Sequence, residues 1–358
     1  MERVYLDHNA TSSLRPRVAR LWRELSAEGL GNPSSLHASG RRVRAVIDDA
    51  RAAIAAALDV HEEEIYFTSG GTEANNIAVQ SARQKGVLLT TPIEHAAVLE
   101  VADMLSKRGK AVKRLTVSRD GRINPDQVAF LMETSAVDLV ALSIANNEIG
   151  TVQPIADLRH YFESAECRPL LFIDAVQALG RIELDFKDAL RHVDMASFSM
   201  HKLGGPMGVG VLYARRGTPV RPLAFGGGHE EGLRPGTENA AAIAAAALAV
   251  TLAIEALPKE QARTRALTRA MWDYLNTGEH DLELLGPGFD EPEARLGNTL
   301  AVLARGRDAR MLVTRLDQEG VELSAGSACS SGAIEPSHVL AALGIEGEDA
   351  RRDRKSVV

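Results

Sequence analysis

One lysine of this sequence stands where it could act as a nucleophile. Lys202 follows the apolar run Met195–Ser199 and precedes a glycine-rich loop that begins at Gly204. A lysine held away from bulk water beside a hydroxyl and an imidazole, here those of Ser199 and His201, is suited to form a Schiff base. A single lysine in a loop is more often a solvated surface residue, so Lys202 needs support from other motifs.

A second segment combines glycines with the start of a helix. Thr68–Asn75 follows a strand-like run, contains Gly70, Gly71 and Thr72, and opens a helix-like run. Glycines let an anion approach the backbone, and the free N–H groups of a first helical turn favour a phosphate. An ordinary strand-to-helix turn with a capping threonine explains the same segment equally well. It lacks the lysine of a P-loop and the spacing of a dinucleotide-binding GxGxxG motif.

An acidic residue ends another apolar run. Asp174 closes the segment Leu170–Asp174, and open α/β sheets bind ligands at the carboxyl edge of their strands. A carboxylate there can hold a protonated ring nitrogen, although a helix-capping aspartate is a simpler alternative. Lys202, Asp174 and the Thr68–Asn75 turn are together the three groups expected to bind pyridoxal 5′-phosphate (PLP).

The two cysteines differ in their surroundings. Cys329 lies in the small-residue segment Gly326–Ser331, where a thiolate is accessible and can attack a bound sulfur atom. A buried structural thiol is the alternative, but glycine and serine make a poor core. Cys167, next to Arg168, is interpreted as an incidental thiol. Two cysteines are too few for a disulfide framework and favour a reducing compartment.

Ordered motifs cover nearly the whole chain: Tyr5–Thr11, Gly31–His37, Thr68–Asn76, Glu94 with His95, Asn146–Gly150, Asp174–Gln177, His201 with Lys202, Gly226–Asn239 and Gly326–Ser331. In these motifs the chain resembles the NifS-like branch of the cysteine desulfurases, within the class V group of fold-type-I PLP enzymes. The resemblance implies an α/β fold: a large domain with a mainly parallel, seven-stranded sheet flanked by helices, plus a smaller α+β domain. It also implies an enzyme that takes sulfur from L-cysteine as a persulfide on Cys329 and releases L-alanine.

The resemblance further implies partners and uses for that sulfur. The implied uses are iron–sulfur cluster assembly and tRNA thiolation. The implied partners are L-cysteine, a second copy of the chain in a homodimer, and a sulfur-acceptor protein, either an iron–sulfur scaffold or a tRNA-thiolation enzyme.

The resemblance assigns a role to each matched residue. Lys202 would bind PLP covalently, Asp174 would keep the ring nitrogen protonated, and Gln177 would hydrogen-bond the phenolic oxygen. His95 would stack on the ring and serve in proton transfer, and Asn147 would lie near the cofactor and the substrate carboxylate. The phosphate would be held by Gly71, Thr72, Ser199 and His201, with Thr237 reaching in from the other subunit. No residue is expected to bind a metal.

The chain departs from the family pattern at three places. Met200 and Met207 stand where a small residue and a lysine are usual. After Ser337–Gly344 the chain lacks the Arg-Phe-Ser-type strand whose arginine binds the substrate carboxylate, so its ending is expected to be truncated or diverged. Arg351, Arg352 or Arg354 could replace that arginine, although none has the matching context. Loss of such a charge-assisted contact predicts weak turnover with a raised KM.

Two kinds of alternative function stay open. Within the enzymes, a selenocysteine lyase or an aminotransferase shares most of these motifs, although an aminotransferase has no use for the thiol of Cys329. Outside the enzymes, the missing arginine favours a PLP-binding scaffold with weak or no turnover.

The elements that must position these residues alternate between strand-like and helix-like, which is typical of a mainly parallel sheet. Strands are expected at Glu64–Thr68, Val87–Thr90, Leu139–Ile144, Leu170–Asp174, Met195–Ser199, Gly208–Tyr213 and Asn298–Leu303. Helices are expected at Val43–Ala57, Glu73–Gln84, Ala97–Lys107, Pro125–Glu133, Ile155–Ser164, Glu260–Leu275 and Arg310–Glu319. The pattern of strand-like and helix-like segments changes at Pro258. This change divides the chain into a large PLP-binding domain, 16–257, and a small domain, 1–15 with 258–358.

Composition is that of an ordinary globular protein: 358 residues, 45% hydrophobic and 25% charged, with a net charge of -7. The absence of a dense basic block argues against direct nucleic-acid or membrane-surface binding, and the N-terminus lacks the apolar core of a signal peptide. Ala240–Ile254 carries no charge but is shorter than the ~20 residues of a membrane span. It is expected to be a buried helix that stops before Pro258, in a cytoplasmic protein.

Overall fold

The computed structural model describes residues 3–29, 31–83, 85–278, 281–326 and 337–345, and the backbone of 356–357. Cys329, Arg351, Arg352 and Arg354 lie outside these ranges.

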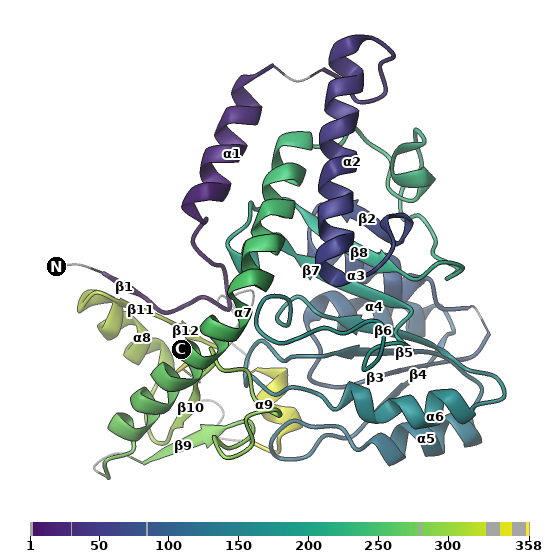
Figure 1. Ribbon diagram of the computed structural model, residues 1–358. Helices are drawn as coiled ribbons and strands as arrows, with labels where there is room; N and C mark the ends of the chain where they lie inside the picture. The colour runs from purple at the N-terminus through teal and green to yellow at the C-terminus, as the bar shows by residue number, and fades with distance from the viewer. Residues whose placement is uncertain are drawn as a thin grey trace.

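A seven-stranded sheet forms the centre of the molecule (Figure 1). Its spatial order is β2-β8-β7-β6-β5-β3-β4. Strand β8 runs antiparallel to β2 and to β7, and the other neighbouring pairs are parallel. The strands are β2 (Ile65–Thr68), β3 (Val87–Thr90), β4 (Ala111–Arg114), β5 (Val137–Ser143), β6 (Leu170–Asp174), β7 (Met195–Ser199) and β8 (Gly210–Ala214). The mainly parallel sheet that the resemblance implied is confirmed. The pattern of the sequence had indicated six of these strands and missed β4.

The sheet is buried on both faces, as parallel sheets are. Along β5, Leu139 and Ala141 pack toward one set of side chains, whereas Val140 and Leu142 pack toward another. The first set includes residues of α3 (Gly71–Gln80) and α4 (Ala96–Lys107). The second set includes residues of α1 (Pro16–Ala27), α2 (Ala38–Leu58), α5 (Pro125–Thr134), α6 (Arg159–Ser164) and α7 (Ala240–Leu275). The expected helix Ile155–Ser164 is a 3-10 turn, η2 (Ile155–Leu158), followed by α6.

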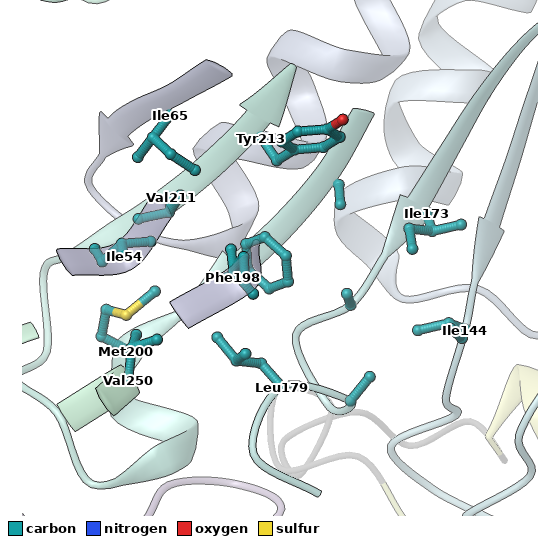
Figure 2. Close-up of a cluster of buried hydrophobic side chains, with 14 of the residues drawn as sticks. Ile54, Ile65, Ile144, Ile173, Leu179, Phe198, Met200, Val211, Tyr213 and Val250 are labelled. Carbon is teal, nitrogen blue, oxygen red and sulfur yellow. The ribbon is translucent and has the colours of Figure 1, made fainter. Parts of the chain in front are cut away.

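Figure 2 shows the core between β7, β8 and α7, where Met200 lies among Phe198, Val211 and Val250. Met200 opens the 3-10 turn η3 (Met200–Leu203) directly after β7 and has no exposed surface. Its flexible side chain fills the space between the turn and α7, which accounts for a large residue at this position. Met207, by contrast, is 69% exposed.

Helix α7 corrects one prediction. The sequence indicated a helix that ends before Pro258 and a second helix after it, and this is wrong, because a single helix runs from Ala240 to Leu275 with Pro258 inside it. A proline inside a helix costs about 3 kcal/mol, since it removes one N–H donor and crowds the preceding turn. Burial of the helix before Pro258, and of Thr268 after it, offsets that cost.

By length and composition α7 could cross a membrane, but its position in the fold is that of a core helix. Ala245, Ala246, Ala249 and Val250 have no exposed surface, and α7 packs against α1 and α2. The expected burial of Ala240–Ile254 is confirmed.

Smaller sheets lie beside the end of α7 (Figure 1). An antiparallel sheet has the order β12-β13-β10-β9, and β1 pairs in parallel with β11. These strands are β1 (Val4–Tyr5), β9 (Leu282–Leu285), β10 (Ala301–Ala304), β11 (Val321–Glu322), β12 (Ser324–Ala325) and β13 (Ser356–Val357), with helices α8 (Ala309–Gln318) and α9 (His338–Ala342). The division of the chain at 257/258 falls inside α7 and stays a prediction.

Candidate active site

A cavity of about 190 Å³ opens at the carboxyl ends of three neighbouring strands, β5, β6 and β7. The last residues of these strands, Ser143, Asp174 and Ser199, all line it, and Ser143 pairs with Asp174 in the register of the sheet. Nine predicted site residues meet there: Gly71, Thr72, His95, Asn147, Asp174, Gln177, Ser199, His201 and Lys202. Thr237 is exposed and is not among the lining residues, and Cys329 lies outside the described residues.

Asp174 is held in a fixed orientation at the end of β6. The residue is 6% exposed, its Oδ2 accepts a hydrogen bond from Asn75 Nδ2 at 2.7 Å, and its Oδ1 accepts one from the backbone N–H of Val176 at 3.0 Å. A carboxylate that keeps its acceptor positions in a low-dielectric setting interacts strongly with a cation placed before it. This geometry fits the predicted pairing with a protonated ring nitrogen.

The first turn of α3 faces the same cavity through Gly71 and Thr72. A Cβ on Gly71 would approach Val176 Cγ2 to 2.7 Å, so the close packing of this turn requires glycine. The first N–H groups of a helix have no partner within the helix, and they favour a negatively charged group. The turn therefore fits a phosphate.

Lys202 reaches toward the N-terminal segment of the chain. Its Nζ donates hydrogen bonds of 2.7 Å to the carbonyl oxygens of Asn9 and Ala10, and Ser12 Oγ donates to the carbonyl of Lys202 at 2.8 Å. Turn η3 places the lysine at the cavity, because the chain leaves the buried strand β7 only three residues earlier. The lysine is part-buried, as a Schiff-base nucleophile requires.

His201 is a neutral ring at physiological pH. Burial, followed by the charges of Lys202 and Arg181, lowers the pKa of His201 to about 4. Its Nδ1 lies 3.0 Å from Thr11 Oγ1. A neutral imidazole offers one donor and one acceptor, so His201 can donate to a phosphate without adding charge.

His95 caps helix α4 with its ring. Nδ1 accepts a hydrogen bond from the backbone N–H of Ala97 at 3.0 Å, so in the neutral ring the proton is on Nε2. The neighbouring Glu94 is 1% exposed and accepts from the backbone N–H of Ser143 at 2.6 Å, from Ser143 Oγ at 2.5 Å and from Thr91 Oγ1 at 2.7 Å. Burial, together with the charge of Asp174, raises the pKa of Glu94 to about 7. Glu94 thus connects the loop that carries His95 to the end of β5.

Gln177 and Asn147 complete the set through the N-terminal segment. Gln177 Nε2 donates to the carbonyl of Asn9 at 3.0 Å, and Asn9 Nδ2 donates to the carbonyl of Asn147 at 3.2 Å.

Sequence reasoning missed other residues that line or support the cavity. They are Asp7, Asn9, Ala10, Asn75, Ser143, Ala145, Val176, Ser324 and Gly326. The motif Tyr5–Thr11 supported the resemblance, but no site role was drawn from it. Asn75 lies in the turn that was expected to bind phosphate, where its contact with Asp174 has no signal in a single sequence.

Thr237 lies in a segment that is attached to the start of α3, because Arg234 Nε donates to Glu73 Oε1 at 3.1 Å. It follows the 3-10 turn η4 (His229–Gly232), in which Glu230 and Glu231 have φ of 46° and 55°. Arg51 donates to both carboxylate oxygens of Glu230, at 3.0 and 2.7 Å, and the N–H of Phe67 donates to Oε2 at 2.7 Å. A bidentate pair thus holds Glu230, one of these two strained residues, in place.

The donor set of the cavity fits PLP. It combines a primary amine, a buried carboxylate, a helix N-terminus with a hydroxyl at Thr72, and the neutral ring of His201. The amine suits the aldehyde of PLP, and the carboxylate suits its pyridinium nitrogen. The helix N-terminus, Thr72 and His201 suit its phosphate.

Comparison with known proteins agrees with this geometry. The class-V aminotransferase family matches residues 4–348. The cysteine desulfurase IscS of Dictyoglomus turgidum is 39% identical over 347 residues, covering 96% of this chain and 86% of that protein. The cysteine desulfurase NifS of Azotobacter vinelandii is 38% identical over 352 residues, covering 96% of this chain and 85% of that protein.

The fold agrees as well. A solved structure described as a NifS-like protein superposes with a TM-score of 0.87 at 34% identity, covering 99% of this chain and 93% of that one. Family, fold and cavity coincide over nearly the whole length, and the chain belongs to the class-V aminotransferase family.

Proposed function

We propose that this protein is a PLP-dependent cysteine desulfurase that removes sulfur from L-cysteine and releases L-alanine. The observation that carries the proposal is the meeting of Lys202, Asp174 and the α3 N-terminus in one cavity. The desulfurases among its relatives support the choice of substrate.

The chain's own residues would divide the work as follows. Lys202 holds PLP covalently, Asp174 keeps the ring nitrogen protonated, and Gly71, Thr72, Ser199 and His201 bind the phosphate. PLP, when bound, supplies an electron-withdrawing ring that weakens bonds in the attached amino acid. His95, with its proton on Nε2, is placed to move a proton at the substrate, and Asn147 lies near the substrate carboxylate.

Cys329 would accept the sulfur. Its thiolate attacks the substrate Sγ, an S–S bond forms, and the Cβ–S bond breaks with its electron pair left on the substrate. A proton then replaces the sulfur at Cβ, which yields alanine and a persulfide on Cys329. Reduction or attack by an acceptor thiol releases the sulfur from the protein.

Described residues on both sides of Cys329 support this role. Gly326, three positions earlier, lines the cavity, and Ser324 Oγ donates to Asp7 Oδ2 at 2.6 Å. On the other side, Ser337 Oγ donates to Glu148 Oε2 at 2.7 Å, and His338 Nε2 donates to the carbonyl of Glu94 at 2.9 Å. Both flanks of the cysteine segment are therefore attached to the loops of the site.

The partners follow from the same proposal. The functional unit is a homodimer in the cytoplasm in which Thr237 of each subunit completes the phosphate site of the other. The sulfur passes to an acceptor protein that serves iron–sulfur clusters or tRNA thiolation.

The test measures alanine and sulfide formed from L-cysteine by the PLP-loaded protein. Cys329→Ser is expected to abolish both products while the visible absorbance of bound PLP stays. Cys167→Ser is the matched control, because Cys167 is exposed and does not line the cavity, and it is expected to keep full activity. Alanine formation by the Cys329→Ser protein, or from selenocysteine alone in the unaltered protein, would overturn the proposal.

A further inference from the structure

Arg181 is a part-buried cation behind the proposed cofactor lysine. Its guanidinium donates to Gln177 Oε1, to the carbonyl of His8 at 3.2 Å and to the carbonyl of Lys202 at 3.3 Å. All of these acceptors are uncharged, and no carboxylate of the described residues forms an ion pair with it. Burial lowers the pKa of Arg181 to about 10, so the group keeps its charge at neutral pH.

The contact with Gln177 fixes which way that amide points. An arginine can only donate, so the oxygen of the amide faces Arg181 and its NH₂ group faces the opposite way. There Nε2 donates to the carbonyl of Asn9 at 3.0 Å, at the wall of the cavity. A cation on the amide oxygen also polarises the amide and strengthens Nε2 as a donor.

The charge of Arg181 also acts on the groups around Lys202. Burial lowers the pKa of His201 and that of His8, and the charge of Arg181 lowers both further. Arg181 also contacts Lys202 directly, through the backbone carbonyl of the lysine, so its positive charge lies beside this residue.

We infer that Arg181 is a positioning residue that holds the Gln177 amide with its N–H groups toward the cofactor and places a positive charge behind Lys202. The inference rests on the proposed function, because it concerns PLP held on Lys202. Among the described residues, the other titratable or charged groups that line the two cavities are Asp7, His8, Arg15, His95, Asp174, His201, Glu260 and Arg263.

The test uses the full-length, PLP-loaded protein and records its visible absorbance against pH. Arg181→Met removes the charge and the donors at similar side-chain length. Arg263→Met is the matched control, because Arg263 lines the neighbouring cavity with Arg181 but pairs with Glu260 at 2.7 Å. Arg181→Lys keeps the charge and loses the planar fork.

In Arg181→Met the midpoint of the absorbance titration is expected to rise by about one pH unit, since loss of a nearby cation favours protonation at Lys202 Nζ. The Arg263→Met midpoint stays at the wild-type value. In Arg181→Lys the midpoint also stays at the wild-type value, because the charge is kept. The dissociation constant for PLP is expected to rise about tenfold, because a lysine ammonium does not hold the Gln177 amide as the planar guanidinium does. Arg181→Lys also carries the test if Arg181→Met does not fold.

Two results would overturn the inference alone: an unchanged midpoint in Arg181→Met, or a wild-type PLP affinity in Arg181→Lys. If the unaltered protein shows no visible absorbance that Lys202→Ala abolishes, the proposed function fails, and the inference fails with it.

Discussion

Asp174 lies where the ends of the strands meet, and its carboxylate accepts two hydrogen bonds. Among the described residues, no ion pair compensates its negative charge. A cation bound in front of Asp174, such as a protonated ring nitrogen, would supply the missing charge. Asp174→Ala removes a charge-assisted contact of about 1.5–3 kcal/mol, which is roughly a 10- to 150-fold loss of PLP affinity. Titration of the apo-protein with PLP measures this loss, and an affinity within twofold of wild type would contradict the assigned role.

Glu94 makes stability depend on pH. Its pKa is about 7 in the folded protein and about 4.5 in the unfolded chain, so the folded state binds the proton more tightly. The contribution of Glu94 to the free energy of unfolding is then largest below pH ~4.5. This contribution falls as the pH rises through ~7, by up to about 3 kcal/mol in total. Glu94→Gln cannot ionise and lacks this slope. Denaturant unfolding of both apo-proteins at several pH values gives the difference, and parallel curves would refute it.

At the scale of elements, the pair between α2 and η4 joins parts of the chain that lie far apart in sequence. Glu230 is buried, and Arg51 also lies over the Phe67 ring at 4.8 Å. Removing one partner of a buried pair costs about 3–5 kcal/mol, because the other charge is left without compensation. Arg51→Met and Glu230→Gln are each expected to lose about that much unfolding free energy. The double variant should lose clearly less than the sum, whereas additive losses would show that the two groups act independently.

Elements with a strong hydrophobic pattern could be predicted from the sequence, and those without one could not. Strands β3, β6 and β7 have the predicted bounds because their residues are almost entirely buried and mostly apolar. Strand β4 was missed because, at the sheet edge, its residues are mostly exposed. Pro258 was interpreted as a helix end because its local cost is visible in the sequence, whereas the tertiary packing that outweighs it is not.

The same limit applies to the site. Residues with distinctive chemistry, such as Lys202 and Asp174, could be chosen from type and position. Asn9 and Ala10 contribute backbone carbonyls, for which residue type carries no signal.

At the scale of the whole molecule, the proposed role of Thr237, which is exposed in the single chain, predicts sites shared between two subunits. Lys202→Ala and Thr237→Ala would each inactivate or weaken a homodimer. In a mixed dimer both lesions fall in one site and the other site is intact, so the purified mixed dimer is expected to regain about half of the wild-type activity. Desulfurase assays on the tagged, purified mixed dimer measure this. Activity no higher than that of either parent would place Thr237 outside the partner's site.

The two carbonyl oxygens that hold Lys202 Nζ have a kinetic consequence. Carbonyls accept hydrogen bonds from an ammonium group, and an ammonium nitrogen has no lone pair with which to attack an aldehyde. In the protein without cofactor, Lys202 must release Asn9 and Ala10 and lose a proton before it can capture PLP. The same contacts that place the nitrogen at the cavity therefore delay its reaction with the cofactor.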